Sequence, residues 1–94
     1  MKRKEEKEIV YTPVDAFEIL RVKDARTKSG GCVYFDIKIN GVTIYGCRVV
    51  EGQKTDFIGY PSQKGNDGKW YNIVYVPLAD ADQKLILDAV EAML

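Results

Sequence analysis

Residues 32–46, CVYFDIKINGVTIYG, decide the fold because they encode a β-hairpin by themselves. The first half alternates apolar and polar side chains with the period of a half-buried strand. Asn40 and Gly41 then supply the two positions of positive φ that a type I′ turn requires. Because this turn fixes the strand register, we expect Ile37 to pair with Ile44 on one apolar face.

The second strand of this hairpin needs an irregularity near Gly46. A strictly continued register would place Arg48 in the core and would leave Cys47 and Val49 outside. One extra residue in the strand reverses the two faces, and glycine is common where a strand bulges. We therefore expect a β-bulge at or near Gly46, with Arg48 at the surface.

Further strands flank the hairpin on both sides. Residues 17–23 have a strand pattern, with Phe17 and Ile19 on the face opposite Leu20 and Val22. A polar segment then forms a long hairpin loop before residue 32.

After the central hairpin, residues 55–60 and 70–76 have the composition of strands. Pro61 ends the first of these strands, and Asp67 with Gly68 forms the turn of the polar loop between them.

A helix is predicted to close the chain. Asp80 and Gln83 have the spacing of a capping box. The apolar residues that follow, Leu85 among them, repeat at helical spacing and predict a helix that covers one sheet face. We expect an α+β fold with an antiparallel sheet of four to five strands and one C-terminal helix. We expect residues 16–94 to form a single domain and residues 1–15 to form a charged, partly flexible extension.

Composition restricts the chemistry. The 94 residues include no histidine, so histidine general bases and histidine-containing zinc sites are excluded. Asp36 and Asp56 are separated carboxylates that form no catalytic pair. We therefore expect no enzyme activity, no metal, no cofactor and no small-molecule substrate. Cys32 and Cys47 are expected to be reduced, although a disulfide between their neighbouring strands is the alternative.

The chain is expected to be cytoplasmic and to make no membrane contact. No apolar run reaches the ~20 residues of a membrane span, and no signal-peptide core follows the charged start. The net charge is zero, but it is unevenly distributed. Residues 16–78 carry nine basic and six acidic side chains, whereas residues 79–94 carry one basic and four acidic ones. A weakly basic sheet and an acidic helix permit polyanion binding on one surface.

The loop between the last two predicted strands is a candidate binding surface. Lys64 and Lys69 flank its turn and would contact phosphates, although a solvated hairpin tip is the alternative. Tyr34 and Tyr71 would stack on bases, and Trp70 is a weaker candidate. Aromatic side chains in strands are also common core residues, so this second alternative stays open.

Three segments in this order resemble the SpoVG septation-regulator family of bacteria. They are YGCRVVEG at residues 45–52, DFIGYPSQK at residues 56–64, and DGKWYNI at residues 67–73, followed by Pro77. The resemblance extends over about residues 17–94. The N-terminal extension, the aromatic segment at residues 70 and 71, and the end of the chain directly after the helix depart from the family pattern.

The resemblance implies a homodimer with a curved antiparallel sheet that acts as a DNA-binding and RNA-binding transcription regulator. By position, Arg48 matches the family's strand arginine. Ser62 and Lys64 match its Pro-Ser-x-Lys segment on the nucleic-acid side. The assignment of Lys69 depends on charge alone.

Two functions follow as hypotheses. The first is a nucleic-acid-binding module that favours single strands because of its tyrosines. The second is a protein-interaction or structural homodimer without a nucleic-acid role. In this second case Tyr71, Tyr75, Met93 and Leu94 would be buried against the partner subunit.

Overall fold

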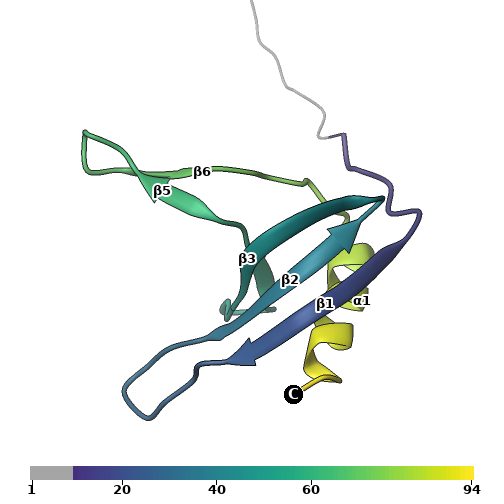
Figure 1. The fold of residues 1–94 in the computed structure, drawn as a ribbon, viewed down its shortest axis with the longest axis horizontal. Helices are drawn as coiled ribbons and strands as arrows, with labels where there is room; N and C mark the ends of the chain where they lie inside the picture. Colours follow the sequence, from purple (N-terminus) through teal and green to yellow (C-terminus); the bar gives the residue numbers. More distant parts are fainter. Residues whose placement is uncertain (1–9) are drawn as a thin grey trace, which may run out of the picture.

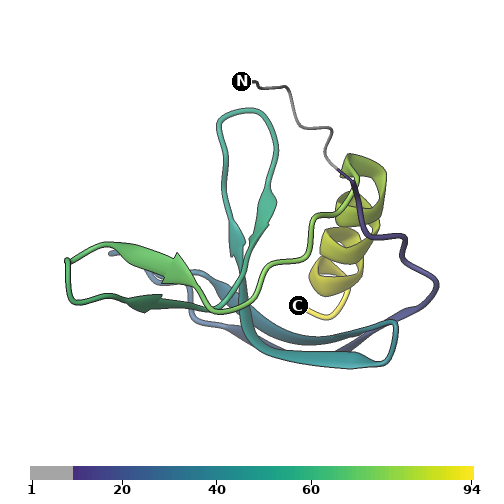
Figure 2. The same ribbon diagram turned by 90° about the horizontal axis from the view of Figure 1, so that it is seen from above.

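The computed structural model describes residues 10–94 and has an α+β fold, which confirms the predicted class (Figure 1). The elements are β1 (Phe17–Asp24), β2 (Val33–Ile39), β3 (Val42–Val50), β4 (Phe57–Gly59), β5 (Ser62–Lys64), β6 (Trp70–Asn72) and α1 (Asp80–Glu91). Strands β1 to β4 form one antiparallel sheet in chain order, the main sheet, while β5 and β6 form a separate antiparallel hairpin, the ribbon. The main sheet curves beneath α1, which lies on one face of it (Figure 2).

The central hairpin has the predicted turn and register. Asn40 has a φ of 50° and Gly41 a φ of 85°, and Ile37 pairs with Ile44. The side chain of Asn40 also ties down the preceding segment. Its Oδ1 accepts the backbone N–H groups of Asp15 and Ala16, and its Nδ2 donates to the carbonyl of residue 13. The turn therefore fixes where β1 begins.

The predicted bulge lies in β3 at Gly46, which has a φ of 79°. Ile37 pairs with Ile44, but Phe35 pairs with Cys47, so β3 carries one extra residue. Asp36 Oδ1 accepts the Gly46 N–H at 2.9 Å and so satisfies a donor near the bulge.

A single apolar core joins the concave face of the main sheet to α1. It consists of Val33, Phe35, Ile37, Ile39, Ile44, Cys47, Ile58, Tyr60, Leu78, Ile86 and Val90. The helix contributes the last two, as its apolar spacing predicts. The inward position predicted for Leu85 is wrong, because this side chain is 59% exposed. Both cysteines are free thiols.

The face assignment in β1 is partly wrong because this strand also bulges. Its register against β2 shifts between Ile19 and Arg21. Leu20 is consequently turned outward, and Val22 joins Phe17 and Ile19 against the core.

The strand predicted at residues 70–76 is shorter in the structure and belongs to the ribbon. Only Trp70–Asn72 form β6, and they pair with β5. Strand β5 was not predicted, because Pro61 directly before it was interpreted as the end of a strand. Gly65 and Gly68 close the tip of the ribbon with a hydrogen bond of 3.1 Å, so the predicted turn is confirmed.

The predicted capping box is wrong. Ala79 is the N-cap of α1, no side chain caps the helix, and Asp80 is already helical. Gln83 instead reaches the sheet, where its Oε1 accepts the backbone N–H of Ile58 at 2.9 Å. The side chain that would have capped the helix connects it to β4.

The predicted N-terminal extension, residues 1–15, lies mostly outside the described residues. The described part of it forms no strand. The Thr12 N–H donates to the carbonyl of Pro77 at 2.7 Å, which holds this segment against the chain that enters α1.

Candidate nucleic-acid interface

One row of side chains crosses the outer face of the main sheet, opposite α1. Lys23 of β1 pairs with Tyr34 of β2, and Tyr34 pairs with Arg48 of β3. Tyr34 is 42% exposed although it lies in a central strand. The ring of Tyr34 therefore lies between two cationic side chains on an open sheet face. We call Lys23, Tyr34 and Arg48 the sheet row.

The absence of a side chain at Gly59 leaves room for the Arg48 side chain at the end of this row. Arg48 pairs with Gly59 of β4, and a Cβ atom at position 59 would come within 2.9 Å of Arg48 Cγ and 3.1 Å of its Cζ. Any larger residue would displace the Arg48 side chain, so glycine lets it lie across β4.

The Tyr34 hydroxyl lies between two opposing influences. The neighbouring Cys32 thiol raises the pKa of Tyr34, and the charge of Arg48 acts in the opposite direction. The pairing of Tyr34 with Arg48 in the β2–β3 register puts both side chains on the same face of the sheet.

A shallow hollow of about 110 Å³ lies beside Tyr34. Arg21, Lys23 and Asp36 supply its charged lining. Two cations against one carboxylate leave the hollow with a net positive charge. Cations beside an aromatic ring are the combination that binds a base and its phosphate.

The ribbon divides the other predicted site residues between two faces. Lys64 pairs with Trp70, and Gln63 pairs with Tyr71. Successive side chains of a strand point to opposite faces, so Ser62 and Lys64 share one face with Trp70. Tyr71 lies on the other face. Trp70 is 67% exposed beside an exposed lysine.

Tyr71 is held by its own hairpin. Its hydroxyl donates to the Asp67 carboxylate, and this bond lowers the pKa of Asp67 and raises the pKa of Tyr71. Its ring packs over Gly65, where a Cβ would come within 2.8 Å of a ring carbon. Asp67 also accepts the Lys69 N–H at 3.0 Å. Tyr71 is therefore exposed, but it carries an acidic neighbour that opposes phosphate.

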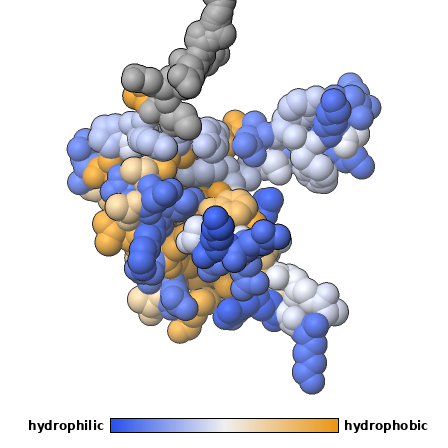
Figure 3. Space-filling view, turned by 180° about the vertical axis from the view of Figure 1, so that it is seen from behind, coloured by the Kyte–Doolittle hydropathy of each residue, from blue (hydrophilic) through white to orange (hydrophobic). Residues whose placement is uncertain are grey.

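The five predicted site residues do not form one cluster. Arg48 lies on the main sheet, whereas Ser62, Lys64, Lys69 and Tyr71 lie on the ribbon, which projects from the body (Figure 1). The tip of the ribbon is largely hydrophilic in surface colour (Figure 3).

Sequence reasoning did not select Lys23, and it named Tyr34 only as one candidate for stacking. The alternation of residues 33–39 already puts Tyr34 on the polar face. Lys23, by contrast, needed the β1–β2 register, and the long connecting loop carries no signal that fixes it.

Two other features are absent from residues 10–94, a metal site and a membrane-spanning helix. This part of the chain contains no group of three or more cysteine and acidic side chains arranged to hold a metal ion. Its single helix is too short and too polar to cross a membrane.

These features define a small α+β protein with a cationic, aromatic sheet surface. No family model matches the chain. A curated relative from Symbiobacterium thermophilum, which carries the name septation protein SpoVG, is 36% identical over 75 residues. The match covers 77% of this chain and 51% of the relative, so the chain spans about half of that protein's length. The resemblance to SpoVG is therefore confirmed, and the chain is SpoVG-like.

Proposed function

We propose that this protein is a non-enzymatic regulator that binds single-stranded DNA or RNA through the outer face of its main sheet. The observation that carries the proposal is the sheet row. Tyr34 offers a ring for base stacking, and Lys23 and Arg48 pair with it from the two neighbouring strands. In the proposed complex these two cations contact the phosphates of the bound strand.

The ribbon extends this surface with further cations. Lys64 and Trp70 repeat the pairing of a cation with an exposed ring, and Ser62 shares their face. We propose Lys69 as an additional phosphate contact at the tip. Tyr71 contributes less to stacking, because its hydroxyl is bound to Asp67.

The carboxylates of Asp36 and Asp56 belong to different surfaces and do not form an acid–base pair. Asp36 accepts a backbone N–H at the bulge, and Asp56 belongs to the loop before β4. This arrangement supports the non-enzymatic part of the proposal, because a general acid or base must reach a substrate proton.

Fluorescence anisotropy tests the proposal with labelled single-stranded oligo(dT), the same length of RNA, and a DNA duplex. Measurements at two salt concentrations should show affinity falling as salt rises, since bound phosphates release counterions. Tyr34→Ala should weaken single-strand binding about tenfold, because a stacked base contributes ~1–3 kcal/mol. Tyr11→Ala is the matched control, since Tyr11 is similarly exposed and lies outside the main sheet.

A double change of Lys64 and Lys69 to Ala separates the contribution of the ribbon. It should reduce the slope of log affinity against log salt concentration by about two, one for each lost phosphate contact. The melting temperature should stay unchanged, because both side chains are exposed. Absence of binding to all three probes, or equal losses in Tyr34→Ala and Tyr11→Ala, would contradict the proposal.

A second candidate function is a homodimer, the ribbon dimer, that forms through residues 73–75 directly after β6 of the ribbon. Ile73 and Tyr75 are each 65% exposed, and an isolated two-stranded hairpin is marginally stable in water. A second copy that covers this surface would supply the missing burial. This dimer is compatible with nucleic-acid binding on the sheet row.

A further inference from the structure

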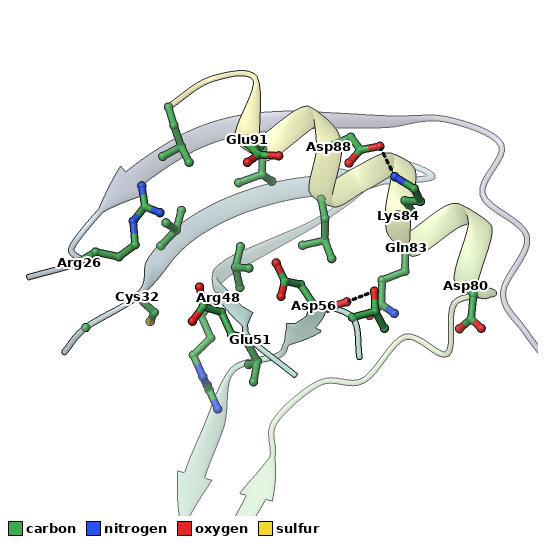
Figure 4. Close-up of a pocket in the computed structure, with 18 residues that line it drawn as sticks. Arg26, Cys32, Arg48, Glu51, Asp56, Asp80, Gln83, Lys84, Asp88 and Glu91 are labelled. Atoms are coloured by element: carbon green, nitrogen blue, oxygen red, sulfur yellow. Dashed lines mark hydrogen bonds and ion pairs between the residues drawn. The ribbon is translucent and has the colours of Figure 1, made fainter. Parts of the chain in front are cut away.

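A groove of about 730 Å³ lies between α1 and the ends of β2 and β3 (Figure 4). Its apolar lining comes from Val33, Val49, Val50, Leu87, Val90 and Leu94. The space-filling view of the helix side shows hydrophobic surface interrupted by hydrophilic side chains (Figure 3). The groove shares Arg48 with the sheet row, but its other lining residues form a second surface on the helix side of the sheet.

Carboxylates surround this apolar lining. They are Glu51, Asp56, Asp80, Asp88 and Glu91, from the loop after β3 and from the helix. Together they place negative charge on both sides of the groove (Figure 4).

The cations near the groove do not balance these carboxylates. Lys84 is paired with Asp88 at 3.2 Å. Arg26 is held by Asp24 through two side-chain hydrogen bonds of 2.9 and 2.7 Å, which lower the pKa of Asp24 to about 2. The charge of Arg26 also acts on Glu51 and Glu91, so three cations stand against five carboxylates in the groove. Arg48 points away from the helix in Figure 4. Among residues 10–94, the other four carboxylates of the groove form no ion pair.

We propose that this groove binds a short peptide segment of a partner protein that carries both basic and large apolar side chains. The apolar lining would take the apolar anchors, since desolvated anchor residues dominate peptide recognition. The carboxylates would attract Lys or Arg side chains and orient the segment. Nucleic acid is disfavoured here because its phosphates would face the same carboxylates. The surface is thus complementary to a cationic protein segment.

The first test uses a fluorescein-labelled synthetic peptide of alternating Leu and Lys residues and its counterpart with Glu in place of Lys. Anisotropy should show that the full chain binds the Lys peptide and not the Glu peptide. Glu51→Lys with Glu91→Lys should weaken binding at least about tenfold, because both attractions become repulsions. Asp15→Lys with Glu18→Lys is the matched control, since it changes the net charge equally away from the groove.

The apolar contribution is tested separately on the helix side. Leu94→Ser removes an anchor contact from the lining and should weaken peptide binding several-fold. Leu85→Ser is its control, because Leu85 is similarly exposed but does not line the groove. Circular dichroism should show all these variants folded, because the changed side chains are exposed.

Tyr34→Ala distinguishes this inference from the proposed function. It should leave peptide binding unchanged whether or not the sheet row binds nucleic acid. The inference is overturned if the Lys peptide does not bind. It is also overturned if the charge-reversed groove variant and its control lose affinity equally, because binding would then follow net charge rather than the groove.

Discussion

At the scale of single residues, Cys47 connects the bulge of β3 to the core. It is 0% exposed, and burial raises the pKa of its thiol to about 11. Burial also raises the pKa of the neighbouring Tyr60 phenol, whose hydroxyl donates to the Val76 carbonyl at 2.8 Å. Both groups are held neutral because this part of the core offers no solvent to a negative charge.

The buried thiol predicts a loss of stability at alkaline pH. The folded-state pKa of Cys47 exceeds its ordinary value of 9.0, so the folded state holds a proton that the unfolded state loses. Its contribution is complete below about pH 9 and declines as pH rises toward 11. From about pH 8 to about pH 10, the free energy of unfolding should fall by about 1 kcal/mol more in the natural chain than in Cys47→Ala.

Urea unfolding at the two pH values measures this difference. The range ends before Tyr60 begins to contribute strongly, because the ordinary pKa of tyrosine is 10.0. If the free energy of unfolding falls equally with pH in the natural chain and in Cys47→Ala, ionisation of the thiol does not destabilise the fold. Cys32→Ala is the comparison that should keep the full slope, since Cys32 is only partly buried.

The two bulges show what single residues reveal before a structure is known. The bulge at Gly46 could be predicted, because a regular strand would have buried Arg48 and exposed Cys47. The bulge between Ile19 and Arg21 could not, because Leu20 and Val22 are both apolar and either could face the core. A bulge is visible in sequence only where it prevents a costly burial.

At the scale of elements, α1 and β4 depend on one shared hydrogen bond. Gln83 Oε1 accepts the Ile58 N–H at 2.9 Å in a partly buried place. Gln83→Ala removes the acceptor and leaves a buried donor, so the free energy of unfolding should fall by about 1–3 kcal/mol. Urea unfolding measures the loss, and Gln63→Ala on the exposed ribbon is the control.

Hydrogen exchange locates the effect of this change. The Ile58 amide should exchange faster in Gln83→Ala by more than the loss of global stability accounts for. Amides that pair β2 with β3 should lose only as much protection as the free energy of unfolding falls. An unchanged Ile58 rate would mean that the bond contributes nothing to holding β4 against the helix.

The ribbon shows where element prediction fails. Residues 70–76 have strand composition throughout, but pairing stops at Asn72, and the chain then turns toward α1. Strand propensity describes a residue that fits a half-buried sheet, and it does not supply the neighbouring strand. The turn at Asp67 and Gly68 was predictable because turn chemistry is local. The pairing of β5 after Pro61 depended on distant context.

At the scale of the whole molecule, a chain of zero net charge has two surfaces of opposite character. The outer sheet face presents Lys23 and Arg48, while the helix side presents carboxylates around the groove. The charge difference between sheet and helix was visible in the sequence, because charge follows position in the chain. The alignment of Lys23, Tyr34 and Arg48 was not visible in the sequence, because it depends on two strand registers. A bulge sets the register between β2 and β3, and an eight-residue loop separates β1 from β2.

The exposed apolar side chains that follow the ribbon predict self-association. If Ile73 and Tyr75 are buried in a homodimer, changing both to Ser should raise the dimer Kd at least about 100-fold, because each buried side chain contributes ~1.5–3 kcal/mol and both copies carry the change. Sedimentation velocity over a range of concentrations measures the shift toward monomer. Val42→Ser with Tyr45→Ser is the matched control, since these β3 side chains are equally exposed but lie outside the ribbon. Either a monomeric natural chain or an equal shift in both double variants would contradict the ribbon dimer, and the second result would place the contact elsewhere.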